Sequence, residues 1–165
     1  MFVKTLRLLL LCGLWLHLPV AQALCIGPLC SCTVSTINVV FGVVNPIAIG
    51  STDSTGSVRV NCGGIAGLLI PYQIEFGPGG SGSVTARRMS SGANSLGYGL
   101  YSDSSRSSSW GDIAHGSAVN GSMLLDTLGL APAVTHTVYG RVPSGQSTAV
   151  PGVYTDTITV TVTYY

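Results

Sequence analysis

The sequence predicts an all-β sandwich, and three observations support that prediction. Of its 165 residues, 46% are hydrophobic and only 8% are charged, which excludes a disordered chain because such chains combine low hydrophobicity with high net charge. No segment keeps a helical period, and apolar and polar residues instead alternate in short runs bounded by Gly, Ser, Asn and Pro. About eight such runs in a chain of single-domain length are typical of two packed sheets.

The first 23 residues are predicted to be a signal peptide. Lys4 and Arg7 precede an apolar run at 8–20, and residues 21–23 (A-Q-A) fit a cleavage site with small residues at its first and third positions. The apolar run is shorter than the ~20 residues that a membrane span needs. We therefore expect residues 24–165 to form one exported domain, with no later run long enough to span a membrane.

The predicted strands follow one another from residue 34 to the end of the sequence. The first, at 34–41, changes phase near Ser35, so that Ile37, Val39 and Phe41 share a face, and this change predicts a bulge or a bend. The others lie at 58–62, 72–76, 84–89, 96–100, 123–128, 134–142 and 154–164. The sequence contains no internal repeat and no sign of a second domain.

The last predicted strand has the most regular pattern and raises a question of pairing. Ile158, Val160, Val162 and Tyr164 share one face, and threonines occupy the other. The strand is long and β-branched and carries no charge after Asp156, and such a strand on an open edge would template aggregation. Either a neighbouring strand of the same chain or another chain must therefore cover it.

Four cysteines remain after the predicted cleavage. Cys25, Cys30, Cys32 and Cys62 allow three disulfide connectivities, and an oxidising compartment favours bridges. Cys32 and Cys62 each lie in a strand-like run and can be joined if those strands are neighbours, and Cys25 and Cys30 would then close a tight loop. We favour this pairing. The alternative is a zinc site, but the C-x4-C-x-C spacing is unusual and lacks a nearby histidine.

The sequence gives no support to an enzyme, and no cofactor or metal is expected. Residues 77–82 formally match G-x-G-x-x-G, but a strand rather than a helix follows, so we interpret them as a hairpin loop. His115 and His136 are the only histidines after the leader, and no nucleophile motif accompanies them.

Two surface features could bind other molecules. Asp103 and Asp112 flank a serine-rich loop with Trp110, which could hold a sugar or a cation; the favoured interpretation is that Trp110 folds back on the sandwich edge. Arg87 and Arg88 form one short pair, interpreted as a solvated edge. The formal net charge is +1 without a basic stripe, so we expect no nucleic-acid partner.

Several short motifs follow one another in a characteristic order. They are C-T-V-S (32–35), F-G-V-V-N-P (41–46), V-R-V-N-C (58–62), R-R-M (87–89), L-G-Y-G-L-Y-S-D (96–103), W-G-D (110–112), Y-G-R-V-P (139–143) and P-G-V-Y-T-D-T-I-T-V-T-V-T-Y (151–164). Together they resemble the spore coat protein U domain family, which includes subunits of archaic chaperone–usher pili. The similarity covers nearly the whole chain after the leader.

This resemblance implies an incomplete immunoglobulin-like sandwich that lacks one strand. In such subunits a periplasmic chaperone lends the strand, and the N-terminal extension of another subunit later replaces it. By this analogy Ile158, Val160, Val162 and Tyr164 border the groove that the chaperone grips. The expected partners are a periplasmic chaperone, an outer-membrane usher and other pilus subunits. The protein would pass through the periplasm to the cell surface, where it could meet a host or abiotic surface.

The segment before Cys32 departs from the family pattern. Polymerising subunits carry a long alternating donor segment there, whereas residues 24–31 include Gly27 and Pro28, which are poor strand residues. The chain therefore resembles an acceptor without a donor, and we expect a terminal or tip subunit that serves adhesion or biofilm formation. Tip adhesins of the family usually have two domains, so a stand-alone coat protein with a complete sandwich is the alternative.

Overall fold

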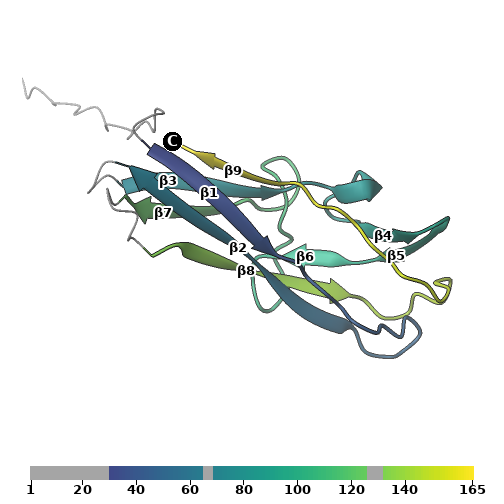
Figure 1. Cartoon of the computed structure of the whole chain (residues 1–165). Coiled ribbons are helices and arrows are strands. Elements are labelled where there is room, and N and C mark those ends of the chain that lie inside the picture. The colour runs from purple at the N-terminus through teal and green to yellow at the C-terminus, as the bar shows by residue number, and fades with distance from the viewer. Residues whose placement is uncertain (1–29, 65–68, 126–131) are drawn as a thin grey trace, which may run out of the picture.

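The computed structural model describes residues 30–64, 69–125 and 132–165. Within these ranges the chain forms nine strands and one short 3₁₀ helix (Figure 1). They are β1 (Cys30–Ile37), β2 (Thr52–Gly64), β3 (Leu69–Phe76), η1 (Gly79–Ser81), β4 (Arg88–Ser91), β5 (Asn94–Gly97), β6 (Gly99–Tyr101), β7 (Val119–Leu124), β8 (Val134–Val142) and β9 (Val160–Tyr164). The predicted signal peptide at 1–23 and Cys25 lie outside the described residues. No described segment is a helix of the length and hydropathy that crossing a membrane requires.

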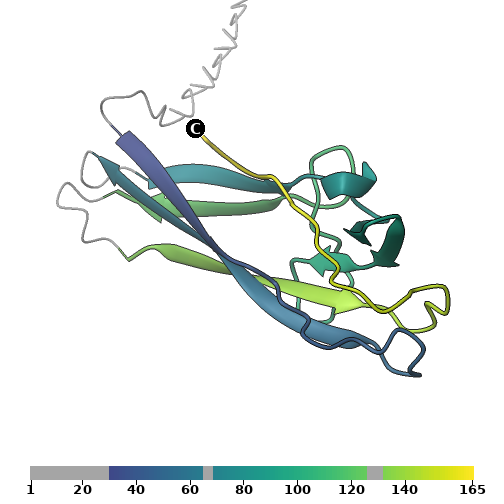
Figure 2. The ribbon, with the colours of Figure 1, turned by 45° about the vertical axis from the view of Figure 1, so that its right-hand side comes forward.

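The strands form two main antiparallel sheets and one small hairpin. One sheet has the order β1-β2-β8-β6, the second has the order β7-β3-β9, and β4 pairs with β5. Figure 2 shows the two main sheets as layers with the hairpin at one end. The core lies between the layers and takes its side chains mainly from β2 and β3, including Val58, Val60, Tyr72 and Ile74. The predicted all-β sandwich is confirmed.

The strand order is that of an immunoglobulin-like sandwich. The sheet β1-β2-β8-β6 corresponds to strands A, B, E and D of that fold, and β3 and β9 correspond to C and F. In the complete fold strand G pairs with the outer side of F. No strand among the described residues pairs with that side of β9.

The first predicted strand differs from the structure. β1 keeps one constant register with β2 along its whole length, so of the two predicted alternatives the bulge is excluded. Ile37 is 70% exposed, whereas Val39 and Phe41 are half-buried and pack on the core after β1 has ended. Gly56 and Gly140 make this packing feasible, because a Cβ at either position would collide with Val39. The change of phase in the sequence therefore marks the end of a strand.

The predicted run at 96–100 is divided between two sheets. Leu96 in β5 faces Met89 of β4, whereas Leu100 in β6 faces Gly140 of β8, and Tyr98 is buried between them. Alternation indicates which side chains turn inward and carries no information on which strand is the partner. By contrast, β8 has the predicted bounds, and β2 and β3 contain their predicted runs.

Candidate functional site

Each main sheet ends in a strand that has no described partner on its outer side. Among the described strands, β1 pairs only with β2, and β9 pairs only with β3. β7 and β8 lie close together at one flank of the sandwich, because Val119 of β7 and Thr137 of β8 line the same pocket. β1 and β9 lie at the opposite ends of the two sheets and therefore share the other flank, as Figures 1 and 2 show. We call this surface, formed by residues 30–37 and 158–164, the β1–β9 flank.

The β9 side of this flank carries alternating apolar side chains. Ile158, Val160 and Val162 are half-buried and pack against the core, and the threonines between them are exposed. Tyr164 lies at the end of the row and is 38% exposed. The four side chains predicted to border a groove therefore lie along one edge strand and the residues just before it.

The β1 side of the flank is covered poorly. Cys30 is the only buried residue of β1, while Val34 is 43% exposed. The paired strand β2 buries Val58 and Val60 completely, which shows how much closer the core is to β2 than to β1. Apolar surface thus remains accessible between β1 and β9, where a further strand could bury it.

Disulfide chemistry ties β1 to its neighbour. Cys32 and Cys62 face each other in the β1–β2 register and form a disulfide, with 4.0 Å between their Cα atoms. The pairing favoured from the sequence is therefore present in the structure. Cys30 is disulfide-bonded as well, and its predicted pairing with Cys25 stays a prediction because Cys25 lies outside the described residues.

The chain before β9 is held at defined points, which sets the position of the edge strand. The predicted strand at 154–164 is shortened to β9, and Thr155 instead forms an isolated bridge with Ser90. The Asp156 carboxylate accepts hydrogen bonds from the Gly80 N–H at 2.9 Å and the Tyr98 hydroxyl at 2.7 Å. Burial, together with this bond to a carboxylate, raises the pKa of Tyr98. Nothing local in the sequence marks this anchor, because its partners are distant along the chain.

Two loops carry exposed apolar side chains at the opposite pole from the start of β1. Val43 and Ile49 are fully exposed in the loop before β2, and Val153 is 83% exposed in the loop after β8. The Gln146 N–H donates to the Pro46 carbonyl at 2.8 Å, which joins the two loops. Figures 1 and 2 both place these loops far from β1's first residue and from the C-terminus. We call them the apolar pole (residues 42–51 and 143–153).

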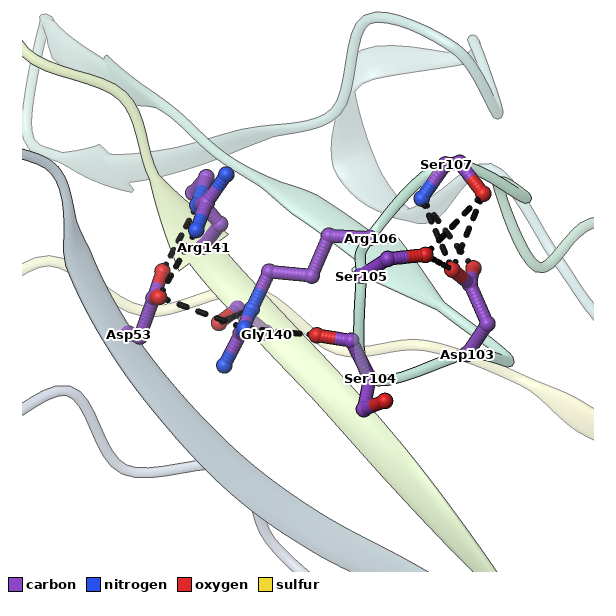
Figure 3. Close-up of polar contacts among 8 residues, drawn as sticks. All are labelled: Asp53, Asp103, Ser104, Ser105, Arg106, Ser107, Gly140 and Arg141. Carbon is purple, nitrogen blue, oxygen red and sulfur yellow. Dashed lines mark hydrogen bonds and ion pairs between the residues drawn. The ribbon is translucent and has the colours of Figure 1, made fainter.

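A polar cluster joins the outer face of the β2–β8 pair to the serine-rich loop (Figure 3). Arg141 binds Asp53 through two hydrogen bonds of 2.7 and 2.8 Å, and Arg106 reaches the same carboxylate at 3.2 Å. These hydrogen bonds and charges lower the pKa of Asp53. The Arg106 guanidinium also donates to the Gly140 carbonyl and lies 5.8 Å from the centroid of the Tyr139 ring.

Asp103 organises the serine-rich loop from within. Its carboxylate accepts hydrogen bonds from the side chains of Ser105 and Ser107 and from the N–H groups of Ser107 and Ser108. These donors, led by the Ser105 hydroxyl, lower the pKa of Asp103. Arg106 has a positive φ of 59°, which is unusual for a residue with a side chain. The loop is therefore a fixed structure, and its carboxylate is occupied by its own donors.

The histidines and the glycine-rich segment do not form a catalytic arrangement. His115 lies against Asp112 in an exposed turn, whereas His136 contacts the Tyr72 hydroxyl between the sheets at 2.8 Å. The glycine-rich segment contains η1, a single 3₁₀ turn, and is tied to Asp156. Among the described residues no three His, Cys, Asp or Glu side chains are grouped so that they could hold a metal.

Two surface interpretations can be compared with the structure, which agrees with the favoured one for Trp110. Trp110 is 1% exposed, stacks on Phe76 and donates its ring N–H to the Ile74 carbonyl, so it packs in the sandwich and offers no exposed platform. The solvated-edge interpretation of the arginine pair is wrong for Arg87, which is also 1% exposed. Its guanidinium donates to three backbone carbonyls, which compensates for burial of the cation; these are Phe76, Gly77 and Trp110. Arg88 is exposed.

The sequence model of the Spore Coat Protein U domain family matches residues 23–161, which is most of the chain. This chain belongs to the spore coat protein U domain family. The resemblance noted from the ordered motifs is therefore confirmed. A comparison with curated protein sequences finds no match.

Two solved structures are similar to this member of the spore coat protein U domain family. One is the crystal structure of the CsuC–CsuE chaperone–tip adhesion subunit pre-assembly complex from archaic chaperone–usher Csu pili of Acinetobacter baumannii, with 25% identity and a TM-score of 0.49. The other is a chaperone–tip adhesin complex of CFA/I fimbriae, with 18% identity and a TM-score of 0.42. The matches cover 81% and 77% of this chain but only 39% and 37% of the others, so this chain spans well under two thirds of either.

Proposed function

We propose that this chain is a structural, non-enzymatic subunit of a chaperone–usher surface pilus and that its β1–β9 flank accepts a strand from another chain. The observation that supports the proposal most strongly is the pair of edge strands, β1 and β9, at one flank. The side chains of Val160 and Val162 on β9 are only half-buried there. An added strand would supply backbone partners for β9 and cover these side chains. Membership of the spore coat protein U domain family supports the same assignment.

The proposed occupants follow the order of export. A signal peptide at 1–23 directs the chain to the periplasm, where a chaperone strand fills the β1–β9 flank, with Ile158, Val160, Val162 and Tyr164 bordering the groove. At the outer-membrane usher, a strand from another pilus subunit replaces the chaperone. The bridge between Cys32 and Cys62 supports this sequence, because it fixes β1 as one wall of the groove before any strand arrives.

We place the subunit at the end of the pilus and assign the apolar pole to adhesion, including biofilm formation. Val43, Ile49 and Val153 expose apolar surface at the pole far from the start of β1. Exposed apolar clusters of this kind mark sites that bind other surfaces. A host or abiotic apolar surface would bury them. In this arrangement the flank attaches the subunit and the far pole makes contact.

Periplasmic expression with and without a matching chaperone tests the assignment. We expect soluble protein only in a one-to-one complex, as measured by size-exclusion chromatography. Val160→Asp should abolish the complex, because an ionised carboxylate in an apolar groove is unfavourable. Thr161→Asp is the matched control, since Thr161 is exposed on the same strand, and should leave the complex intact.

The opposite result would replace the pilus assignment. If the chain emerges without a chaperone as a stable monomer that unfolds cooperatively, its sandwich is complete by itself, and a stand-alone coat protein becomes the better description. For adhesion, Ile49→Ser should reduce retention of cells on an apolar surface while the chaperone complex forms normally. Unchanged retention would remove the apolar pole from the proposal.

A further inference from the structure

A small polar pocket lies on the flank opposite to the β1–β9 flank. It has a volume of about 220 Å³ and lies between β8, β7 and the residues around the serine-rich loop. Most of its lining carries hydroxyl groups or an imidazole; the residues are Ser102, Thr135, Thr137, Tyr139 and His136. This composition differs sharply from the apolar row along β9.

The pocket presents hydrogen-bonding groups without a net charge. Hydroxyl groups can both donate and accept, and a neutral imidazole carries one donor and one acceptor. Burial lowers the pKa of His136, so its ring is neutral at pH 7. The Tyr72 hydroxyl lies 2.8 Å from His136 Nε2, which leaves Nδ1 as the second polar atom of the ring. The chemistry fits a ligand rich in uncharged hydroxyl groups.

The backbone of β8 contributes further hydrogen-bonding capacity beside the pocket. β6 pairs only with residues 139–141 of β8, so residues 134–138 have no described strand partner on that side. Thr135 and Thr137, which line the pocket, belong to this unpaired stretch. Free backbone N–H and C=O groups require partners, which a polar ligand or water can supply.

The wall of the pocket beside Ser102 is held in place by the polar cluster of Figure 3. The N–H of Ser102 donates to the Ser108 carbonyl at 3.1 Å, and Arg106 fastens the same loop to Asp53. A strained φ such as that of Arg106 persists only where the surroundings over-determine it, and such positions concentrate at ligand sites. A site that is already ordered loses less entropy when a ligand binds.

We propose that this pocket binds one residue of a neutral carbohydrate. Its volume lies below the ~300–1,000 Å³ of pockets for drug-sized ligands, which limits the occupant to about one sugar ring. The inference does not depend on the proposed pilus function, because the pocket lies on the other flank. If a donor strand fills the β1–β9 flank, the pocket stays open to the side of the assembly.

Saturation-transfer NMR on the full chain, in its soluble form alone or with a chaperone, tests this site. The probes are free glucose, galactose, mannose and N-acetylglucosamine. We expect saturation transfer to at least one sugar at millimolar concentration. Thr137→Val and Ser102→Ala should each weaken its affinity about tenfold, the effect of one lost hydrogen bond.

The matched control is Thr161→Val, which removes an exposed hydroxyl from β9 in the other sheet and should leave the affinity unchanged. Thermal unfolding of each variant checks that the fold is retained. Two separate pocket variants are used so that the test can still be made if one of them does not fold. Absence of transfer from all four sugars to the folded chain would overturn the proposal. Binding that persists unchanged in both pocket variants would overturn it equally.

Discussion

The two flanks of the sandwich differ in the way their edges are completed. At the β1–β9 flank, two strands end the sheets, half-buried aliphatic side chains lie between them, and residues 158–164 carry no charge. At the other flank, the serine-rich loop covers part of β8, and Arg106, Asp53 and Arg141 fasten it by ion pairs. Hydrophobic interactions are non-directional, so an apolar surface can bind any strand of suitable register. Charge-assisted hydrogen bonds are directional, so the charged network holds the loop in one position. The first flank leaves two edge strands with apolar side chains, and the second is partly covered by a loop that charged groups hold in place.

Removal of the disulfide should have the largest effect and should act on one flank. Replacing Cys32 and Cys62 by Ser together should lower the free energy of unfolding by about 3 kcal/mol, because the bridge closes a long loop. Hydrogen exchange should accelerate first in β1, since β2 is the only described strand that pairs with it. If exchange accelerates equally in β8 and the serine-rich loop, the flanks form one cooperative unit and the contrast between them fails.

The sequence predicts the layers better than the edges for a physical reason. Alternation records which side chains turn inward, so β2, β3 and β8 are found together with their buried faces. The alternation does not indicate which strand is the partner. The sequence therefore does not show that the run at 96–100 divides between two sheets. β9 is shorter than its pattern because Thr155 already pairs with Ser90.

The side-chain sites divide in the same way. Cys32 and Cys62 can be paired from the sequence because each lies in a recognisable strand. Arg87 is misread because only the folded chain brings three carbonyl groups around its guanidinium. The network of Asp53 with Arg141 joins residues 88 positions apart, and nothing local marks either partner. The β8 pocket is equally invisible, since its lining comes from separate segments.

Loss of the Asp156 anchor should have an intermediate effect on the β1–β9 flank. Asp156→Ala removes the acceptor of the Gly80 N–H and leaves the buried Tyr98 hydroxyl without its partner, which should cost about 2 kcal/mol. Denaturant unfolding measures the change. Tyr98→Phe is the control, because it removes the hydroxyl together with its need for a partner, and should cost less. Equal losses would mean that neither the Gly80 contact nor an unpartnered Tyr98 hydroxyl contributes measurably.

Acidification should produce the smallest effect, and it should act on the flank that carries the serine-rich loop. Because hydrogen bonds from Arg141 and the nearby Arg106 charge lower the pKa of Asp53 below its ordinary 3.8, the carboxylate stabilises the fold fully above that value. This contribution is lost as the pH falls through the lower folded-state pKa. Asp53 is partly exposed, so solvent screening limits the effect to about 0.5 kcal/mol. Asp103 responds in the same direction, since its hydrogen bonds also lower its pKa.

Amide hydrogen exchange between pH 5 and 2.5, corrected for the intrinsic pH dependence of exchange, separates the flanks. Protection in the serine-rich loop should fall as Asp53 takes up a proton, whereas protection in β9 should change less, because β9 contains no Asp, Glu or His. Asp53→Asn provides the matched control: its loop should already be less protected at pH 5 and should show a smaller further loss. If β9 loses protection in parallel with the loop, the charged network also supports the open flank. The two edges would then be stabilised by one shared set of interactions.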